Sequence, residues 1–220
     1  MWEGVGTICD TYSVWAKNYH KFRLNVLRDI FINKLQIEKD TKILDIGCGS
    51  CIFREFLSPE ECPEITAFDI DPAISNTHPI TFIVDNAQKP ALTGKWDIVY
   101  AGEVIEHLPS PNEAFIAWDR LLKPGGYMVV TTPNGLFPDQ FEQHISLMSV
   151  SKMKKMFELH NYKIIEIMGN NFFIPFFDSL VKPLWRFEKL VDSLYDIKFK
   201  LPGKYGIMAR NMIYIAQKEY

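Results

Sequence analysis

The segment from Lys42 to Ser50 constrains the fold more than any other part of the chain. It is an aliphatic run that carries one acidic residue, Asp45, and ends in two glycines one residue apart, Gly47 and Gly49. This pattern predicts a buried strand that stops, turns sharply and leads into a helix. Glycine permits backbone conformations closed to other residues and lets a ligand approach the main chain. In an α/β sheet such a turn binds a nucleotide-like ligand beyond the carboxyl ends of the strands.

The residues around this turn favour a cationic ligand over a pyrophosphate. The dinucleotide fingerprint requires a third glycine, and Ile52 occupies that position. The Asp45 carboxylate would repel a phosphate and suits a ligand that is cationic or donates hydrogen bonds. The string Leu-Asp-Ile-Gly-Cys-Gly at 44–49 resembles motif I of the class I S-adenosylmethionine-dependent methyltransferases, whose ligand carries an ammonium and a sulfonium. The resemblance implies cofactor contacts by Asp45, Gly47, Cys48 and Gly49.

Later segments carry further features of this family. A second predicted strand ends at Asp69, about 20 residues beyond the glycine turn, where a carboxylate can accept both ribose hydroxyls. A third, at 80–84, runs into Asp85, which in the family accepts from the adenine amino group; a turn-forming Asp-Asn pair is the alternative. Leu-Lys-Pro-Gly-Gly at 122–126 resembles the motif ahead of the family's fifth strand. The resemblance also implies cofactor contacts by Tyr19, Ile70, Asn86 and Ala101, although Tyr19 also suits a packing helix.

The order of these segments predicts a single domain of the α/β class. Strand, helix and strand repeat four times with short links, which implies parallel strands joined by right-handed crossovers. The family resemblance adds a seven-stranded, mostly parallel Rossmann-like sheet with an antiparallel last strand and a helical insertion before it. Within one methyltransferase domain at 1–220, we expect an N-terminal helical cap at 1–40, a cofactor-binding core at 41–168, a helical insertion at 169–208 and the last strand at 209–220.

A group of ionisable residues follows the fourth predicted strand, which spans 96–100. On a helix, Glu103 faces Glu106 and His107 at spacings of three and four residues. Two carboxylates and an imidazole suit a divalent metal, and His144, after the fifth strand, could complete the site. Alternatively His107 is a general base without any metal, or the segment only orients its loop. The predicted catalytic residues are His107 and His144, and the hypothetical metal ligands are Glu103, Glu106, His107 and His144.

This Glu-x-x-Glu-His pattern with a later His resembles two groups, the ubiquinone-pathway O-methyltransferases and the small-RNA 3′-terminal 2′-O-methyltransferases. In both, the resemblance implies a metal that holds the acceptor hydroxyl and lowers its pKa. We therefore expect S-adenosylmethionine-dependent O-methylation of a small, partly apolar or lipid- or sugar-like acceptor, with Mg²⁺, Mn²⁺ or Zn²⁺ as the candidate ion. The alternatives are methylation of an RNA 3′ terminus and a catalytically silent cofactor-binding partner subunit.

Charge, hydrophobic runs and cysteine spacing limit the binding partners, the location and the metal chemistry that we expect for this chain. A net charge of −3 disfavours broad nucleic-acid binding. The N-terminus lacks a basic region followed by an apolar core, and no apolar run approaches the ~20 residues that span a bilayer, so a cytoplasmic protein is expected. Cys48 and Cys51 have C-x-x-C spacing, but without a second pair we read them as turn residues rather than as a metal or redox site.

The predicted insertion is rich in aromatic residues interspersed with Lys and Arg. This composition suits an acceptor pocket or helical cap, a membrane-surface patch that reaches a lipid-linked acceptor, or a contact in a homodimer.

Overall fold

The computed structural model describes residues 10–49, 51–62, 64–73, 80–137, 141–172, 174, 176–184, 186–200 and 209–220. Its centre is a seven-stranded sheet of order β3-β2-β1-β4-β5-β7-β6. Strands β1 to β5 pair in parallel, and β7 runs antiparallel to both β5 and β6. The strands are β1 (Ile43–Ile46), β2 (Ile65–Asp69), β3 (Thr81–Val84), β4 (Trp96–Gly102), β5 (Leu122–Pro133), β6 (Tyr162–Phe172) and β7 (Ala209–Lys218). The predicted fold class is confirmed.

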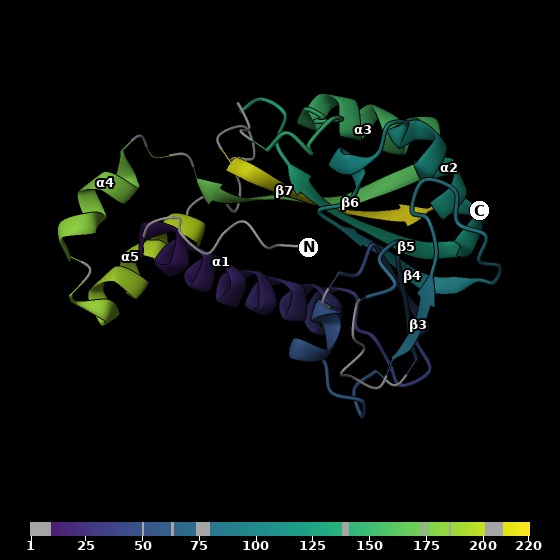
Figure 1. Ribbon diagram of the computed structural model, residues 1–220. Helices are drawn as coiled ribbons and strands as arrows, with labels where there is room; N and C mark the ends of the chain where they lie inside the picture. Colours follow the sequence, from purple (N-terminus) through teal and green to yellow (C-terminus); the bar gives the residue numbers. More distant parts are fainter. Residues whose placement is uncertain are drawn as a thin grey trace.

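Helices cover both faces of the sheet (Figure 1). Helix α1 (Asp10–Arg28) continues into a π-helical turn, Asp29–Lys34, and lies on one face. Helices α2 (Pro111–Leu121) and α3 (Val150–Leu159) lie on the other. Alternate strand residues point to opposite faces, so Ile43, Ile98 and Val129 pack with the end of α1 while Leu44, Val99 and Val130 pack with α2 and α3.

Several connections differ from those predicted. A 3₁₀ helix of four residues, Ile52–Glu55, joins β1 to β2, and residues 85–95, between β3 and β4, form a loop with a single short turn and no helix. The predicted fourfold strand–helix–strand repeat is therefore wrong. Among the described segments that connect parallel strands, α2, between β4 and β5, forms a complete α-helical crossover. The Pro-Gly-Gly segment lies inside β5, where the register with β4 shifts between Trp96 and Ile98. A bulge absorbs these residues, so β5 begins earlier than expected.

The helical insertion contains α4 (Phe177–Val181), a 3₁₀ turn (Lys182–Leu184) and α5 (Glu188–Lys200). Figure 1 shows these helices as a lobe beyond the end of the sheet. The lobe is attached to α1 by an apolar cluster of Phe22, Val181, Val191, Tyr195 and Phe199. Within the described residues, no helix is long and apolar enough to cross a bilayer.

Candidate functional site

The glycine turn lies at the carboxyl edge of the sheet and is tied to β2. The Cys48 amide donates to the Phe68 carbonyl (3.0 Å), and the Gly49 amide donates to Oδ2 of Asp69 (3.0 Å). Gly49 has a φ of 48°, and a Cβ placed on it would meet no atom within 4 Å. The main chain at Gly49 is therefore open to a ligand, and Asp69 lies beside it; a ribose contact by Asp69 stays a prediction.

Asp45 is a buried carboxyl with an unsatisfied oxygen. Its side chain is 2% exposed, and Oδ2 has no hydrogen-bond partner among the described residues. Burial, and then the negative charge of Asp69, raise the pKa of Asp45 well above its ordinary value, while Arg23 opposes that rise. A buried carboxyl in this state calls for a hydrogen-bond donor or a cation, which is what an S-adenosylmethionine ammonium would supply.

Arg23 of α1 is a candidate binding residue that the sequence analysis missed. Burial alone disfavours its charge, but the neighbouring Tyr100, Glu103 and Tyr19 raise the net pKa of the guanidinium. Tyr19 also donates to Oδ1 of Asn170 (3.4 Å), which brings α1 to the end of β6. The available signal was one cation, four residues after Tyr19, on the apolar face of a predicted helix.

The predicted adenine end of the site contains a turn. The Asp85 carboxylate accepts from the backbone amides of Asn86 (2.7 Å), Ala91 (3.0 Å) and Leu92 (2.9 Å). Asp85 thus has the turn-forming role that the sequence analysis left open, and an adenine contact stays a prediction. Ile70 is exposed at the end of β2, whereas Ala101 is buried in β4.

Glu103 and Glu106 do not share a helix face, so that prediction is wrong. Strand β4 ends at Gly102, Glu103 has a φ of 57°, and only Ile105–His107 form a short 3₁₀ helix. Glu103 accepts from the Thr131 hydroxyl (2.8 Å), and Glu106 accepts from the Thr132 hydroxyl (3.0 Å). Because successive strand residues point to opposite faces, Glu103 lies on the α1 side and Glu106 on the side of α2 and α3.

The structure does bring Glu106, His107 and His144 together. One ligand atom from each lies within 4.8 Å of the others, and the two imidazoles form a T-shaped pair 4.7 Å apart. Glu106 is fully buried, and its carbonyl accepts from the Ser146 amide (2.9 Å), which fixes the loop that carries His144. His107 is directed by a hydrogen bond between Nδ1 and the Gln143 carbonyl (3.1 Å). One buried carboxylate and two imidazoles can hold a divalent metal or transfer a proton.

Cys48 and Cys51 are free thiols whose sulfurs lie 3.5 Å apart. Both are buried, and burial followed by nearby negative charge raises the pKa of Cys48. Buried, protonated thiols of this kind are unreactive, consistent with turn residues.

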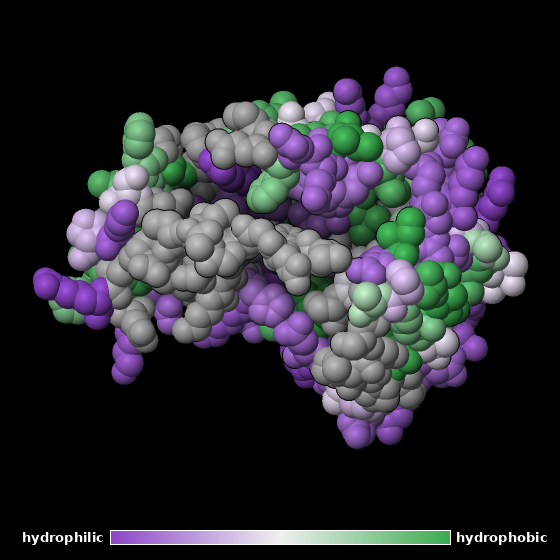
Figure 2. Space-filling model, in the orientation of Figure 1, coloured by the Kyte–Doolittle hydropathy of each residue, from purple (hydrophilic) through white to green (hydrophobic). Residues whose placement is uncertain are grey.

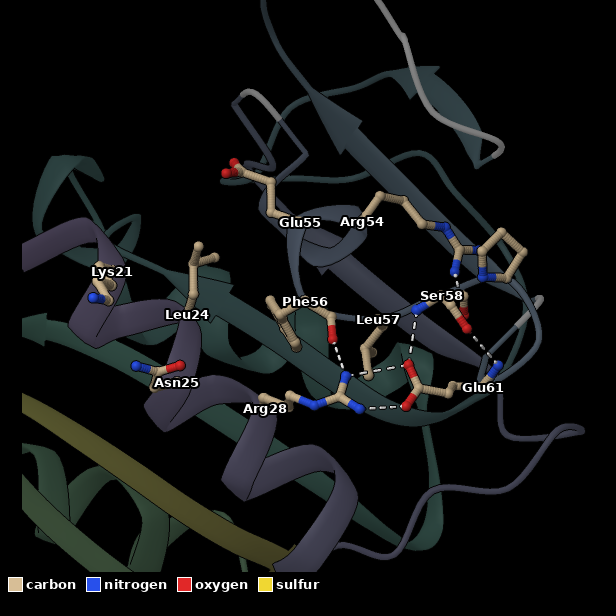
Figure 3. A pocket seen from close by; sticks show the side chains of 11 residues that line it. Lys21, Leu24, Asn25, Arg28, Arg54, Glu55, Phe56, Leu57, Ser58 and Glu61 are labelled. Carbon is tan, nitrogen blue, oxygen red and sulfur yellow. Dashed lines mark hydrogen bonds and ion pairs between the residues drawn. The ribbon is translucent and has the colours of Figure 1, made fainter. Parts of the chain in front are cut away.

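A cavity of about 610 Å³ lies away from these residues, between α1 and the segment after the glycine turn. Figure 3 shows Arg28 reaching from α1 to the Phe56 carbonyl and the Glu61 carboxylate across this cavity. Its lining includes none of the predicted site residues. We interpret it as part of the packing between α1 and the β1–β2 connection.

Sequence comparisons identify relatives of the chain. A family profile described as a methyltransferase domain matches residues 16–167. A ubiquinone biosynthesis O-methyltransferase from Proteus mirabilis is 31% identical over 127 residues, which are 51% of this chain and 50% of the relative. One from Pseudomonas aeruginosa is 31% identical over 122 residues, 50% of this chain and 52% of the relative. The chain therefore spans about half the length of these curated relatives.

Solved structures share the fold. The N-methyltransferase NodS from Bradyrhizobium japonicum, in complex with S-adenosyl-L-homocysteine, has a TM-score of 0.61 at 13% identity and covers 91% of this chain and 87% of its own. A SAM-dependent methyltransferase from Archaeoglobus fulgidus has a TM-score of 0.60 at 18% identity, covering 90% and 97%. At these identities the likeness concerns the fold alone.

Proposed function

The chain belongs to the class I S-adenosylmethionine-dependent methyltransferases, and from this premise we propose that it methylates a hydroxyl group of a small, partly apolar acceptor. The observation that carries the proposal is a convergence at one sheet edge. A buried carboxyl with an unsatisfied oxygen lies beside the glycine turn, and the segments after the adjacent strand β4 and after β5 form a Glu-His-His cluster. The first suits a cationic cofactor, and the second suits the acceptor hydroxyl.

This chain's own residues fit the cofactor. Asp45 would accept from its ammonium, Asp69 from its ribose, and the Arg23 guanidinium would face its carboxylate. Cys48, Ile70, Asn86 and Ala101 are the further residues predicted to contact the cofactor. When bound, S-adenosylmethionine supplies an electrophilic methyl group on a sulfonium.

The Glu106–His107–His144 cluster would handle the acceptor hydroxyl. His107 is partly exposed, so its imidazole can meet a substrate and take the hydroxyl proton as a general base. The same three side chains would hold a divalent ion through one oxygen and two nitrogens, and that ion would lower the pKa of the hydroxyl. A metal titration distinguishes the two chemistries.

Apolar side chains beside the cluster support a partly apolar acceptor. Phe141 and Ile145, on the loop after β5, are both exposed, Ile145 directly follows His144, and the Phe141 ring lies tilted against His144 with its centroid 5.2 Å away. Exposed apolar groups next to titratable ones are typical of a substrate site. The ubiquinone-pathway O-methyltransferase relatives agree with hydroxyl methylation, although they match over half their length.

We further propose that the α4–α5 lobe contacts an anionic lipid surface, from which a lipid-linked acceptor could be taken. Phe176 is 81% exposed and Leu180 69% exposed, while Arg186 and Lys189 are exposed nearby in the chain. Figure 2 shows apolar and hydrophilic residues side by side over this lobe. Apolar anchors flanked by cations suit a membrane interface.

Calorimetric titration with S-adenosylmethionine and with NAD tests the proposal. The protein should bind S-adenosylmethionine and not NAD, and Asp69→Asn should weaken binding by at least ~10-fold, the loss expected for charge-assisted hydrogen bonds. Asp40→Asn, an exposed carboxylate before β1, is the matched control and should bind normally. Mass spectrometry of a hydroxylated acceptor panel should then show methylation at oxygen. Binding of NAD instead, or an Asp69→Asn variant with full affinity, would contradict the assignment of the cofactor site.

A further inference from the structure

A second polar group lies at the carboxyl edge, on the face opposite Glu106. Glu103 at the end of β4, Asn211 at the start of β7 and Asn171 at the end of β6 form a chain of side chains. Nδ2 of Asn211 donates to Oε2 of Glu103, and Nδ2 of Asn171 donates to Oδ1 of Asn211, both at 3.4 Å. Both distances lie at the long end of the hydrogen-bond range, so these hydrogen bonds are weak.

The Asn171 end of this hydrogen-bonded series of side chains has an unpaired oxygen. Asn171 is 4% exposed, and its Oδ1 has no hydrogen-bond donor among the described residues. The orientation follows from Glu103, because a carboxylate only accepts and therefore faces the amino group of Asn211. Oδ1 of Asn211 then faces the amino group of Asn171, which leaves the Asn171 oxygen as the unpaired atom. A buried acceptor without a donor costs stability unless a ligand or water satisfies it.

The position of these three side chains indicates that they contact the methyl-accepting substrate rather than the cofactor. In the sheet order, β6 is four strands from β1, about 19 Å at the usual strand spacing. Asn211 pairs with Pro133 of β5 and with Asn170 of β6, so it lies at the same carboxyl edge as the end of β4. The glycine turn lies on the other side of β4.

We propose that Glu103, Asn211 and Asn171 form a subsite that binds a second hydroxyl group of the methyl-accepting substrate. This hydroxyl is neutral, donates a hydrogen bond and is not the one that is methylated. The unpaired Asn171 carbonyl requires a donor on the ligand, and the Glu103 carboxylate, which accepts from Thr131 and Asn211, has lone pairs for a further donor. Arg23 already lies near the Glu103 charge, so a hydroxyl fits better than a second cation. The inference rests on the proposed function, because it requires an acceptor at this edge. It removes Glu103 from the hypothetical metal ligands.

Asn171→Gly is the sharpest variant. Asn171 has a φ of 55°, which glycine adopts without strain, so the substitution deletes the amide that carries the unpaired oxygen without straining the backbone. Asn161→Gly is the matched control, since Asn161 has a φ of 59° in the exposed turn between α3 and β6. Both variants should fold, and both should bind S-adenosylhomocysteine like the parent protein.

The probe is cis-1,2-cyclohexanediol, titrated into ¹⁵N-labelled protein saturated with S-adenosylhomocysteine and followed by NMR of the side-chain amides. The diol should shift the Asn171 and Asn211 signals, and Asn171→Gly should weaken diol binding about fivefold, as for one neutral hydrogen bond, while Asn161→Gly should not. The dimethyl ether of the same diol, which lacks donors, should cause no such shift.

Three results would overturn the inference: the diol leaves the Asn171 signals unmoved, the ether shifts them equally, or Asn171→Gly binds the diol normally. Failure of the proposed function is distinguishable, because the parent protein would then bind S-adenosylhomocysteine but give no methylation at oxygen with the hydroxylated acceptor panel. Diol shifts confined to the loop of His144 would leave the proposed function intact and still overturn this subsite.

Discussion

Three buried or half-buried polar residues would make much of the proposed ligand contact in this fold. Asp45, Arg23 and Asn171 each place a polar group where the surrounding protein leaves it incompletely satisfied or partly desolvated. Such groups lower the stability of the ligand-free protein and gain partners when ligands bind. The site can therefore be tested through stability and affinity together.

We expect the buried Asp45 carboxylate to lower the stability of the ligand-free protein and to raise its affinity for S-adenosylmethionine. Its pKa in the folded protein is raised, so the folded state binds the proton more tightly than the unfolded state does. The stability contributed by that proton is present at low pH and is lost as pH rises through the raised pKa. Asp45→Asn should therefore melt at a higher temperature than the parent at pH 8, by about 2–4 °C for each ~1 kcal/mol. The same variant should bind S-adenosylmethionine at least ~10-fold more weakly.

Thermal unfolding without ligand, from pH 5 to pH 9, measures the stability effect. The gap between Asp45→Asn and the parent should widen toward high pH, whereas the exposed Asp40→Asn should show no widening. A gap that narrows as pH rises would contradict a raised pKa at Asp45.

Arg23 should recognise the amino-acid part of the cofactor. Arg23→Gln removes the cation that would face the carboxylate, so affinity for S-adenosylmethionine should fall about 10- to 100-fold. Affinity for 5′-methylthioadenosine, which lacks that carboxylate, should stay unchanged. Lys21→Gln, two residues away on the exposed side of α1, is the control. Equal losses for both ligands in calorimetry would mean that Arg23 acts only through packing.

At the scale of elements, the end of β4 and the loop after β5 decide which residues meet. Local patterns predicted β1, the glycine turn and Asp69, because strand periodicity and paired glycines are written in neighbouring residues. Glu103 adopts a left-handed backbone conformation, so it does not share a helix with Glu106 as predicted. The periodicity of the sequence gives no sign of this conformation. Asn171 and Asn211 meet only through the antiparallel pairing of β6 with β7, across an insertion, so the sequence analysis could not place them together.

Because Glu106 and Glu103 lie on opposite faces of β5, we expect metal binding to depend on Glu106 and its two histidines and not on Glu103. If Glu106, His107 and His144 hold an ion, His144→Ala should abolish calorimetric binding of Zn²⁺ or Mn²⁺. Glu103→Gln should leave it unchanged, since Thr131 holds Glu103 on the other face. His160→Ala is the control for the imidazole, because the His160 ring is hydrogen-bonded to Asn112 and is not one of the three ligands of this cluster. Metal lost equally in Glu103→Gln would contradict this division.

At the scale of the whole molecule, the chain combines a site at the sheet edge with a lobe that extends past it. The cluster of Phe22, Val191, Tyr195 and Phe199 attaches α5 to α1, the same helix that carries Tyr19 and Arg23 of the proposed cofactor site. A ligand or surface that engages the lobe would therefore act on an element of the cofactor site. Figure 1 shows α1 running from the lobe beneath the sheet.

Binding to vesicles tests the role of the lobe. We expect the protein to sediment with phosphatidylglycerol vesicles more than with phosphatidylcholine vesicles, because Arg186 and Lys189 favour anionic headgroups. The pair Phe176→Ser and Leu180→Ser should weaken this binding at least ~10-fold, since each side chain would lose its burial in lipid. Leu159→Ser, an equally exposed leucine on α3, should bind like the parent. If the paired variant instead converts a dimer to a monomer in light scattering, with no effect on vesicles, the lobe's partner is a second copy of the chain.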